Sequence, residues 1–392
     1  MNKIPALLLV LLLLTGCPDR REKKPAPTAE MPTQEIELSE TDYNELEDWQ
    51  NDKLDDFIKP FAANCEKIQK LKTTYIYNSK IKIKTADYQR VCMEFLRRQI
   101  KNGNDFRTFI EQNFTPFLIQ TDGGAEGKFT SYYESEIRAS HRRHGKYIYP
   151  VYGKPADLIE INLKDFDPAL PDRRLVGRVN AQKMLPYYTR AEIEKAPFKA
   201  PVLLWGDSLV DIHIMQIQGS AVAKLDDGSH VRVGYADNNG RRFKGIGSIL
   251  LGKKLLPSGK ADMISIKEWL AANPDNAAQL MQENERYIFH RLIEGPGPIG
   301  AFGLPLTAGR SMAVDRQYVP LGAVMWLVTQ TPDKQPLNKL VTAQDIGSAI
   351  KGAVRGDYFW GSGGDEILAQ AGKMNSAGHY YILIPKEAKS DE

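Results

Sequence analysis

Three aspartates near the C-terminal end of the chain lie in turn-rich segments where a carboxyl group could act as an acid or a base. They are Asp315, Asp345 and Asp357. Asp357 precedes three aromatic residues at 358–360, and a carboxyl group among apolar rings loses hydration of its charged form. Its pKa then rises, so that it can donate a proton near neutral pH. The glycines in 361–364 would let a polymer approach the backbone, and the rings would offer flat faces to sugars.

Structural roles compete with this chemistry at each position. Asp315 and Asp345 are better explained by turns, in which aspartate side chains bond to their own backbone. Spacing alone leaves a structural role open for Asp357 as well. His141 and His144 have the spacing of a metal pair, but they lie among arginines without a nearby carboxylate, which favours a solvated loop. The GxSxG, GKS/GKT and HExxH patterns do not occur, and we expect neither a metal nor a cofactor.

The segments that must position these residues are mainly β-like. A strand is predicted at 211–223, since residues 211–218 alternate apolar and polar side chains as a half-buried strand does. A turn at 226–229 would return the chain into 230–235, so we expect a hairpin of an antiparallel barrel. Further strands are predicted at 129–137, 147–152, 202–205, 287–293 and 379–385, and short helices at 246–256, 264–271, 274–284 and 365–374.

The part of the chain before Phe117 is predicted to be mainly helical. Apolar residues at helical spacing support this, among them Leu54, Phe57 and Phe61. Cys65 and Cys92 could form a disulfide in an oxidising compartment or remain two buried thiols, and spacing does not decide between these alternatives.

The N-terminus predicts export. Residues 4–14 are apolar apart from Pro5, and a helix of that length reaches only roughly 17 Å, too short for a hydrocarbon core of about 30 Å. Residues 1–17 therefore indicate a signal peptide. The segment that ends in Cys17 resembles a bacterial lipobox, in which this cysteine receives the lipid. An ordinary signal peptide is the alternative.

Lipidation of Cys17 would make the lipid membrane a partner, since several acyl chains anchor a protein stably. Pro18 follows in place of the aspartate that resembles an inner-membrane retention signal, so we expect the periplasmic face of the outer membrane. Residues 18–35 are predicted to be an extended tether. The net charge of +3 is too small to suggest nucleic acid, and the mature length suggests two domains.

Three further segments occur in order along the mature chain: residues 129–134 (FTSYYE), 149–153 (YPVYG) and 215–220 (MQIQGS). Together with the aspartate segments they resemble the membrane-bound lytic murein transglycosylase A family, in which the first segment is usually written F-T-G-Y-Y-E-P. Ser131 and Ser135 stand where the family pattern has Gly and Pro. The aspartate segments resemble the C-terminal "3D" domain, which is named for three aspartates; these segments are 309–315, 344–352 and 355–363.

The resemblance implies a mainly β fold with a helical N-terminal part. Residues 36–133 and 295–392 would form a double-psi β-barrel catalytic domain, and residues 134–294 would form an inserted, smaller β-barrel domain. Residues 295–298 are a candidate hinge between the two domains, and the glycan groove would lie between them. Asp357 would be the single catalytic acid, with Asp345 supporting the site through hydrogen bonds. The implied substrate-binding residues are Thr130, Tyr132, Gln216, Gln218 and Gly219.

The implied activity is a non-hydrolytic cleavage of peptidoglycan glycan strands. The β-1,4 bond between N-acetylmuramic acid (MurNAc) and N-acetylglucosamine (GlcNAc) would break and leave 1,6-anhydromuramic acid ends. A muramidase-type hydrolase is one alternative, and it would ordinarily use a second carboxylate, for which Asp345 is the candidate. A non-catalytic wall-binding lipoprotein is the other. Proteins of cell-wall synthesis or division are further candidate partners.

Overall fold

The structure is a computed structural model that describes residues 34–195 and 197–387. The predicted signal peptide at 1–17, with its Cys17, and the predicted tether up to residue 33 lie outside the described residues. Within the described ranges, no helix combines the length and the apolar character that a membrane span requires.

Most strands belong to one large sheet that runs through the described chain. Its main strands, in chain order, are β1 (Glu37–Glu40), β2 (Phe114–Gln120), β3 (Gly127–Ser140), β9 (Ala221–Leu225), β10 (His230–Asn238), β11 (Ile288–Ile293), β12 (Ser311–Val314), β13 (Val324–Gln330), β14 (Pro336–Asp345), β15 (Arg355–Ser362) and β16 (Asn375–Pro385). β4 (Tyr149–Tyr152) and β8 (Val202–Gly206) pair with each other, and β8 also pairs with the end of β3. The strands predicted from the sequence outside residues 211–218 are thus confirmed in type.

Six of these strands close into a ring in the order β3, β15, β12, β14, β13 and β16, because β16 pairs again with β3. Within the ring, β3–β15 and β12–β14 are parallel pairs. A closed ring has no free strand edge. Met312, Trp326 and Leu340 of these strands are buried and belong to the same apolar cluster as the residues of the N-terminal helices. The predicted catalytic β-barrel is therefore present.

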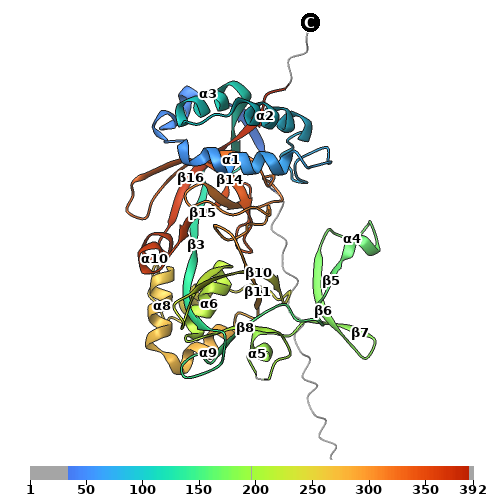
Figure 1. The fold of residues 1–392 in the computed structure, drawn as a ribbon, viewed down its shortest axis with the longest axis vertical. Coiled ribbons are helices and arrows are strands. Elements are labelled where there is room, and N and C mark those ends of the chain that lie inside the picture. The colour runs from blue at the N-terminus through green and yellow to red at the C-terminus, as the bar shows by residue number, and fades with distance from the viewer. Residues whose placement is uncertain (1–33, 196, 388–392) are drawn as a thin grey trace, which may run out of the picture. The chain divides into compact units, whose positions relative to one another are not determined.

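Three helices precede the barrel, as the apolar spacing predicted, and they lie close to one another (Figure 1). They are α1 (Asp55–Ile68), α2 (Thr85–Arg98) and α3 (Gly103–Asn113), with the short 3-10 helices η1 (Tyr43–Glu45) and η2 (Trp49–Asn51) before them. Phe57 and Phe61 of α1 are buried, and Cys65 of the same helix forms a disulfide with Cys92 of α2. Of the two alternatives for this cysteine pair, the structure contains the covalent bond.

β3 joins the barrel to the inserted region in one continuous strand (Figure 1). In its first half, Thr130 lies opposite Asp357 of β15 and Asn375 of β16. In its second half, residues from Ser135 onward pair in parallel with β9, beginning opposite Ala221. A single strand thus fixes the position of the first inserted elements relative to the barrel.

One predicted strand, at 211–223, is wrong over most of its length: residues up to 218 belong to a helix, α6 (Leu209–Gln218), and only residues 221–223 lie in a strand, β9. Ser208 begins the helix by accepting a hydrogen bond from the Asp211 amide, and Gly219 ends it in the left-handed conformation at φ 90°. Residues 212–216 are all buried, so nearly every side of this helix is covered. A helix that is buried on all sides does not need one apolar face, so its sequence shows no clear helical period. The alternation of apolar and polar residues was therefore mistaken for the pattern of a strand.

Other helices of the inserted region are α7 (Ile246–Gly252), α8 (Met263–Ala272) and α9 (Pro274–Gln282), and α10 (Asp365–Ala371) follows β15; all four were predicted. A second, three-stranded sheet was not predicted. It contains β5 (Ile159–Asn162), β6 (Arg174–Asn180) and β7 (Lys183–Pro186), and it extends away from the other strands (Figure 1). The single-turn helix α4 (Leu163–Phe166) lies between β5 and β6 in the sequence, and the single-turn helix α5 (Arg190–Ile193) follows β7.

Candidate active site

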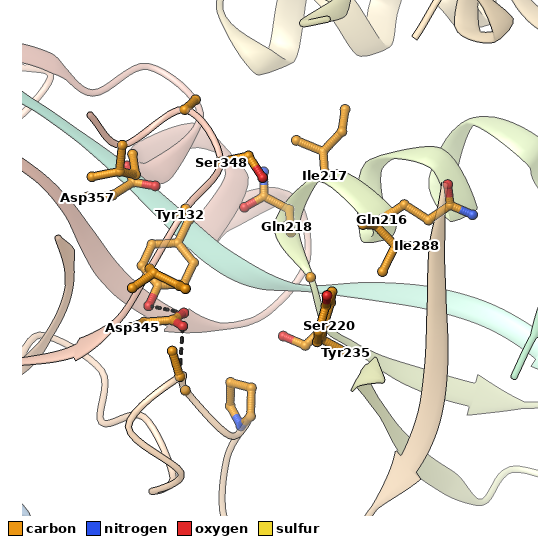
Figure 2. Close-up of a pocket in the computed structure, with 18 of the residues that line it drawn as sticks. Tyr132, Gln216, Ile217, Gln218, Ser220, Tyr235, Ile288, Asp345, Ser348 and Asp357 are labelled. Atoms are coloured by element: carbon orange, nitrogen blue, oxygen red, sulfur yellow. Dashed lines mark hydrogen bonds between the residues drawn. The ribbon is translucent and has the colours of Figure 1, made fainter. Parts of the chain in front are cut away.

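A pocket of about 810 Å³ is lined by residues of both the barrel and the inserted region. This volume lies within the range of sites that enclose a small molecule. Figure 2 shows two facing groups of side chains: Asp357, Tyr132 and Asp345 on one side, and Gln216, Ile217 and Gln218 of α6 on the other. The first group comes from β15, β3 and the end of β14.

Asp357 lies in the middle of the barrel wall. β15 runs between β12 and β3, which puts Asp357 opposite Ala313 on one side and Thr130 on the other. Gly356 permits this close packing, since a Cβ there would lie 2.6 Å from Met312 Sδ. The position of Asp357 is therefore set by strand register and by one close approach of the backbone.

A chain of hydrogen bonds connects Asp357 to a guanidinium. Thr130 Oγ1 donates to Asp357 Oδ1, and Arg355 Nη2 donates to Thr130 Oγ1 over 2.7 Å. Arg355 Nη1 also donates to the backbone oxygens of Lys128, over 3.2 Å, and of Gly356. Arg355 and Asp357 are two residues apart on one strand, so their side chains leave it on the same face.

Burial raises the pKa of Asp357 to about 6. The hydrogen bond from Thr130 and the positive charge of Arg355 act in the opposite direction, while the nearby Asp345 raises the pKa further. Part of the carboxyl surface still reaches the pocket, because Asp357 is only half-buried and lines it. Asp357 is thus a carboxyl group that holds its proton in mildly acidic solution and can exchange it with a bound molecule.

Asp345 is held from two sides. Tyr132 donates its hydroxyl proton to Asp345 Oδ2 over 3.0 Å, and the Ala301 amide donates to Oδ1 over 3.0 Å. Burial raises the pKa of Asp345, and the hydrogen bonds to its charged form oppose that shift. Burial also raises the pKa of Tyr132 well above its usual value, so this phenol remains a hydrogen-bond donor. Asp345 therefore positions Tyr132 and the loop at Ala301.

The inserted region contributes amides from the last turn of α6. Gln218 Oε1 accepts a hydrogen bond from the Tyr133 amide over 3.2 Å, which connects α6 to β3. Gln216 Oε1 is buried and has no hydrogen-bond partner among the described residues. Gly219 ends the helix with a positive φ that a larger residue rarely adopts. The amide oxygen of Gln216 is thus enclosed by the protein, with less than 1 Å² of its surface accessible.

All seven site residues implied by the resemblance, apart from the lipidation site, line the same pocket. They are Thr130, Tyr132, Gln216, Gln218, Gly219, Asp345 and Asp357. Asp315 does not line it: its carboxyl accepts from the backbone amides of Gln317 and Gly352, which is the structural role predicted for it. Cys17, the predicted lipidation site, lies outside the described residues.

The prediction that the aromatic residues after Asp357 offer a stacking surface for sugars in the pocket is wrong. The aromatic residues at 358–360 and the glycines in 361–364 are not among the residues that line the pocket. Tyr358 is buried and bonds to the Gly309 carbonyl, and the ring of Phe359 packs on Tyr132 with centroids 5.1 Å apart. These rings therefore help to exclude water from around the carboxyl groups.

Sequence reasoning missed two groups that act on the carboxyls: Arg355, through Thr130, and the backbone amide of Ala301. Arg355 could have been found, since it lies two residues before Asp357 in an extended segment. The Ala301 amide carried no signal, because it comes from a loop 44 residues away in the chain. His144 bonds to Asp226 in a turn, and within the described ranges no group of three or more His, Cys, Asp or Glu residues could hold a metal ion.

The chain matches the models of two domain families, one after the other along the sequence. Residues 128–291 match the MltA specific insert domain, and residues 310–384 match the 3D domain. The first match covers most of the region predicted as the insertion, and the second contains all three aspartates. Together with the barrel and its buried carboxyl, these matches define a lytic transglycosylase.

Known proteins similar to this chain narrow the class. MltA from Neisseria gonorrhoeae is 31% identical, with 90% of this chain and 94% of the other covered and a TM-score of 0.77. The lytic transglycosylase LtgG of Burkholderia pseudomallei is 34% identical, with 91% and 98% covered and a TM-score of 0.59. Membrane-bound lytic murein transglycosylase A of Escherichia coli K12 is 28% identical over 293 residues, which is 72% of this chain and 73% of that protein. The chain belongs to the membrane-bound lytic murein transglycosylase A family.

Proposed function

We propose that this lytic transglycosylase cleaves the β-1,4 bond between MurNAc and GlcNAc in peptidoglycan, with Asp357 as the only catalytic acid and base. The observation that supports this most is the carboxyl of Asp357, which lines the pocket with a pKa of about 6. Thr130 binds one of its oxygens. The other oxygen is then available to hold a proton toward the glycan.

In the first step, the proton of Asp357 moves to the glycosidic oxygen while the bond from this oxygen to the muramic C1 breaks. Positive charge develops at C1 and its ring oxygen. In the second step, the carboxylate of Asp357 takes the proton of the C6 hydroxyl of the same sugar, and O6 bonds to C1 to close the 1,6-anhydro ring. No water is consumed and Asp357 is protonated again. The nucleophile belongs to the substrate, which provides a proximity advantage.

The surroundings of Asp345 support this route over a muramidase-type hydrolysis. A hydrolase would need a second carboxylate as nucleophile or as base for water. Both oxygens of Asp345 already accept hydrogen bonds, from Tyr132 and from the Ala301 amide. A carboxylate held in this way is a poor nucleophile. Its negative charge, close to Asp357, instead raises the pKa of the acid.

The domain and location assignments belong to the same proposal. The barrel domain comprises 36–133 and 295–392, and the inserted domain comprises 134–294. Cys17 carries the lipid that anchors the protein to the periplasmic face of the outer membrane, and residues 18–35 are the tether. The membrane-bound relatives support an anchor of this kind. The glycan strands are the main partner, and wall-synthesis or division proteins are further ones.

Mass spectrometry of digested peptidoglycan tests the proposal. Wild-type protein is expected to release fragments with 1,6-anhydromuramic ends, and Asp357→Asn is expected to release none. Reducing ends from the wild type would show a hydrolase. A digest that remains intact with folded wild-type protein would show a wall-binding lipoprotein, and unchanged cleavage by Asp357→Asn would remove the role of Asp357.

A further inference from the structure

The hydrogen-bond chain beside Asp357 has a defined direction. A guanidinium has five N–H donors and no acceptor, so Arg355 can only donate to Thr130 Oγ1. The hydroxyl of Thr130 has one proton, and Asp357 Oδ1 is its one hydrogen-bond acceptor among the described residues. Arg355 occupies one of the two lone pairs of the hydroxyl oxygen, which favours the orientation in which the proton is directed toward the aspartate.

This direction determines which carboxyl oxygen carries the acidic proton. If the proton were on Oδ1, it would compete with the hydroxyl proton of Thr130 for the same short contact. With the proton on Oδ2, the donor from Thr130 is satisfied. Among the described residues, no hydrogen bond reaches Oδ2, so a proton there is available to the glycan.

We infer that Arg355 is a positioning residue that acts through Thr130 to keep the proton of Asp357 on Oδ2. The inference rests on the role of Asp357 proposed above. It gives Thr130 a contact with the acid in place of the glycan contact that the family resemblance implies. Arg355 itself is fixed by the Lys128 and Gly356 carbonyls, so its fork is oriented before any substrate binds.

The same chain serves the second half of the reaction. After the first proton transfer, Asp357 is a carboxylate, and the Thr130 hydroxyl with the Arg355 charge behind it stabilises this form. The titratable or charged groups that face Asp357 are Arg355 on its own strand, Asp345 at the end of β14 and Tyr132 on β3. Arg355 is the cation among them, and it opposes the effects of burial and of Asp345 on the pKa.

A pH profile of kcat/KM on purified peptidoglycan tests the inference. Removing the hydroxyl in Thr130→Val or the guanidinium in Arg355→Met should raise the pKa of Asp357, so the alkaline limb moves to higher pH while kcat falls roughly tenfold or more. Thr130→Ser keeps the hydroxyl and should restore both. Lys351→Met removes another cation that lines the pocket but is not bonded to Thr130. In this variant the alkaline limb of the pH profile should keep its position, even if kcat/KM changes.

The double variant distinguishes the hydrogen-bond chain from a simple charge effect. If Arg355 acts through Thr130, the shift in Thr130→Val combined with Arg355→Met is smaller than the sum of the single shifts. Additive shifts would overturn the inference, and so would a change confined to KM, which would make Arg355 a glycan-binding residue. If Arg355→Met does not fold, Arg355→Gln is measured, since it removes the charge and offers Thr130 an acceptor. An active Asp357→Asn would instead refute the proposed function itself.

Discussion

The polar side chains on the two walls of the pocket differ in how many hydrogen-bond partners they have. On the barrel wall, Asp345 has both oxygens bonded and Asp357 has one oxygen bonded by Thr130. On the wall formed by α6, Gln216 keeps a buried oxygen without a partner in the described part of the chain. A buried acceptor left unsatisfied costs free energy, and Gln216 Oε1 has less than 1 Å² of accessible surface, so its side chain must turn before a ligand can reach it. We expect the barrel wall to transfer the proton and the α6 wall, whose residues line the pocket, to bind the glycan.

The backbones behind the walls explain this difference. Asp357 and Thr130 lie on paired strands inside a closed ring, so their separation is fixed by hydrogen-bonded register. Fixed polar groups stabilise changing charge without reorganising during the reaction. Gln216 and Gln218 lie on the last turn of a helix, which Gly219 ends. Loss of a group from the barrel wall should therefore affect kcat, and loss from the α6 wall should affect KM.

The largest expected effect comes from exchanging the carboxyls for amides one at a time. Asp357→Asn should reduce kcat by at least about 10³-fold, because it removes the only acid and base. Asp345→Asn should retain measurable cleavage, since an amide oxygen can still accept from Tyr132 or from the Ala301 amide. Release of anhydro-ended fragments from both variants measures this. The opposite ranking would exchange the roles of the two aspartates.

Asp357→Asn should also be more stable than the wild type at neutral pH. The folded-state pKa of Asp357 is raised from 3.8 to about 6, so its contribution to stability is fully present below 3.8 and is lost as the pH rises through about 6. The corresponding free energy is at most about 3 kcal/mol. Thermal unfolding should show that the unfolding temperature of the variant, relative to that of the wild type, is higher at pH 7 than at pH 5. An equal difference at both values would indicate an ordinary pKa.

The next effect is the pH dependence of the wild type. Asp357 must be protonated to start the reaction, so kcat/KM should fall about tenfold for each pH unit above the pKa of about 6. Initial rates on purified peptidoglycan between pH 4.5 and pH 8 measure this limb. A rate that still rises in the alkaline range would exclude Asp357 as the acid. Circular dichroism at each pH provides the control for unfolding.

The barrel wall could be predicted further from the sequence than the α6 wall. Asp357 beside aromatic residues predicted a buried acid, and the neighbouring strand β3 was predicted as a strand. The segment of Asp357 itself was expected to be rich in turns, whereas the structure places it in the strand β15. α6 was taken for a strand because its apolar residues alternate, although Ser208 and Gly219 are the start and stop signals of a helix. The contact of Ala301 with Asp345 depends on a loop closed by the whole barrel. No local pattern could have indicated it.

A smaller effect separates two glutamines on the same helix. Gln216→Leu should raise KM roughly three- to tenfold with little change in kcat, because we expect the Gln216 side chain, which lines the pocket, to turn and form one neutral hydrogen bond with the glycan. Gln218→Leu leaves the Tyr133 amide without its acceptor, and should lower the free energy of unfolding by about 1–3 kcal/mol. Kinetics and chemical denaturation of both variants measure the pair. A drop in kcat for Gln216→Leu would mean that the α6 wall also takes part in the chemistry.

The smallest expected effect on activity comes from loss of the disulfide, which joins the N-terminal helices α1 and α2. Cys65 and Cys92 are buried in the apolar cluster of the N-terminal helices and do not line the pocket. They close a loop of 27 residues, so replacing both by serine should lower the free energy of unfolding by about 3 kcal/mol. At 25 °C kcat and KM should remain unchanged, because the strands that carry Asp357 and Thr130 are held by the closed ring. If loss of the disulfide also lowered kcat, the helices would be needed to position the acid, and the barrel wall would be less independent than its register indicates.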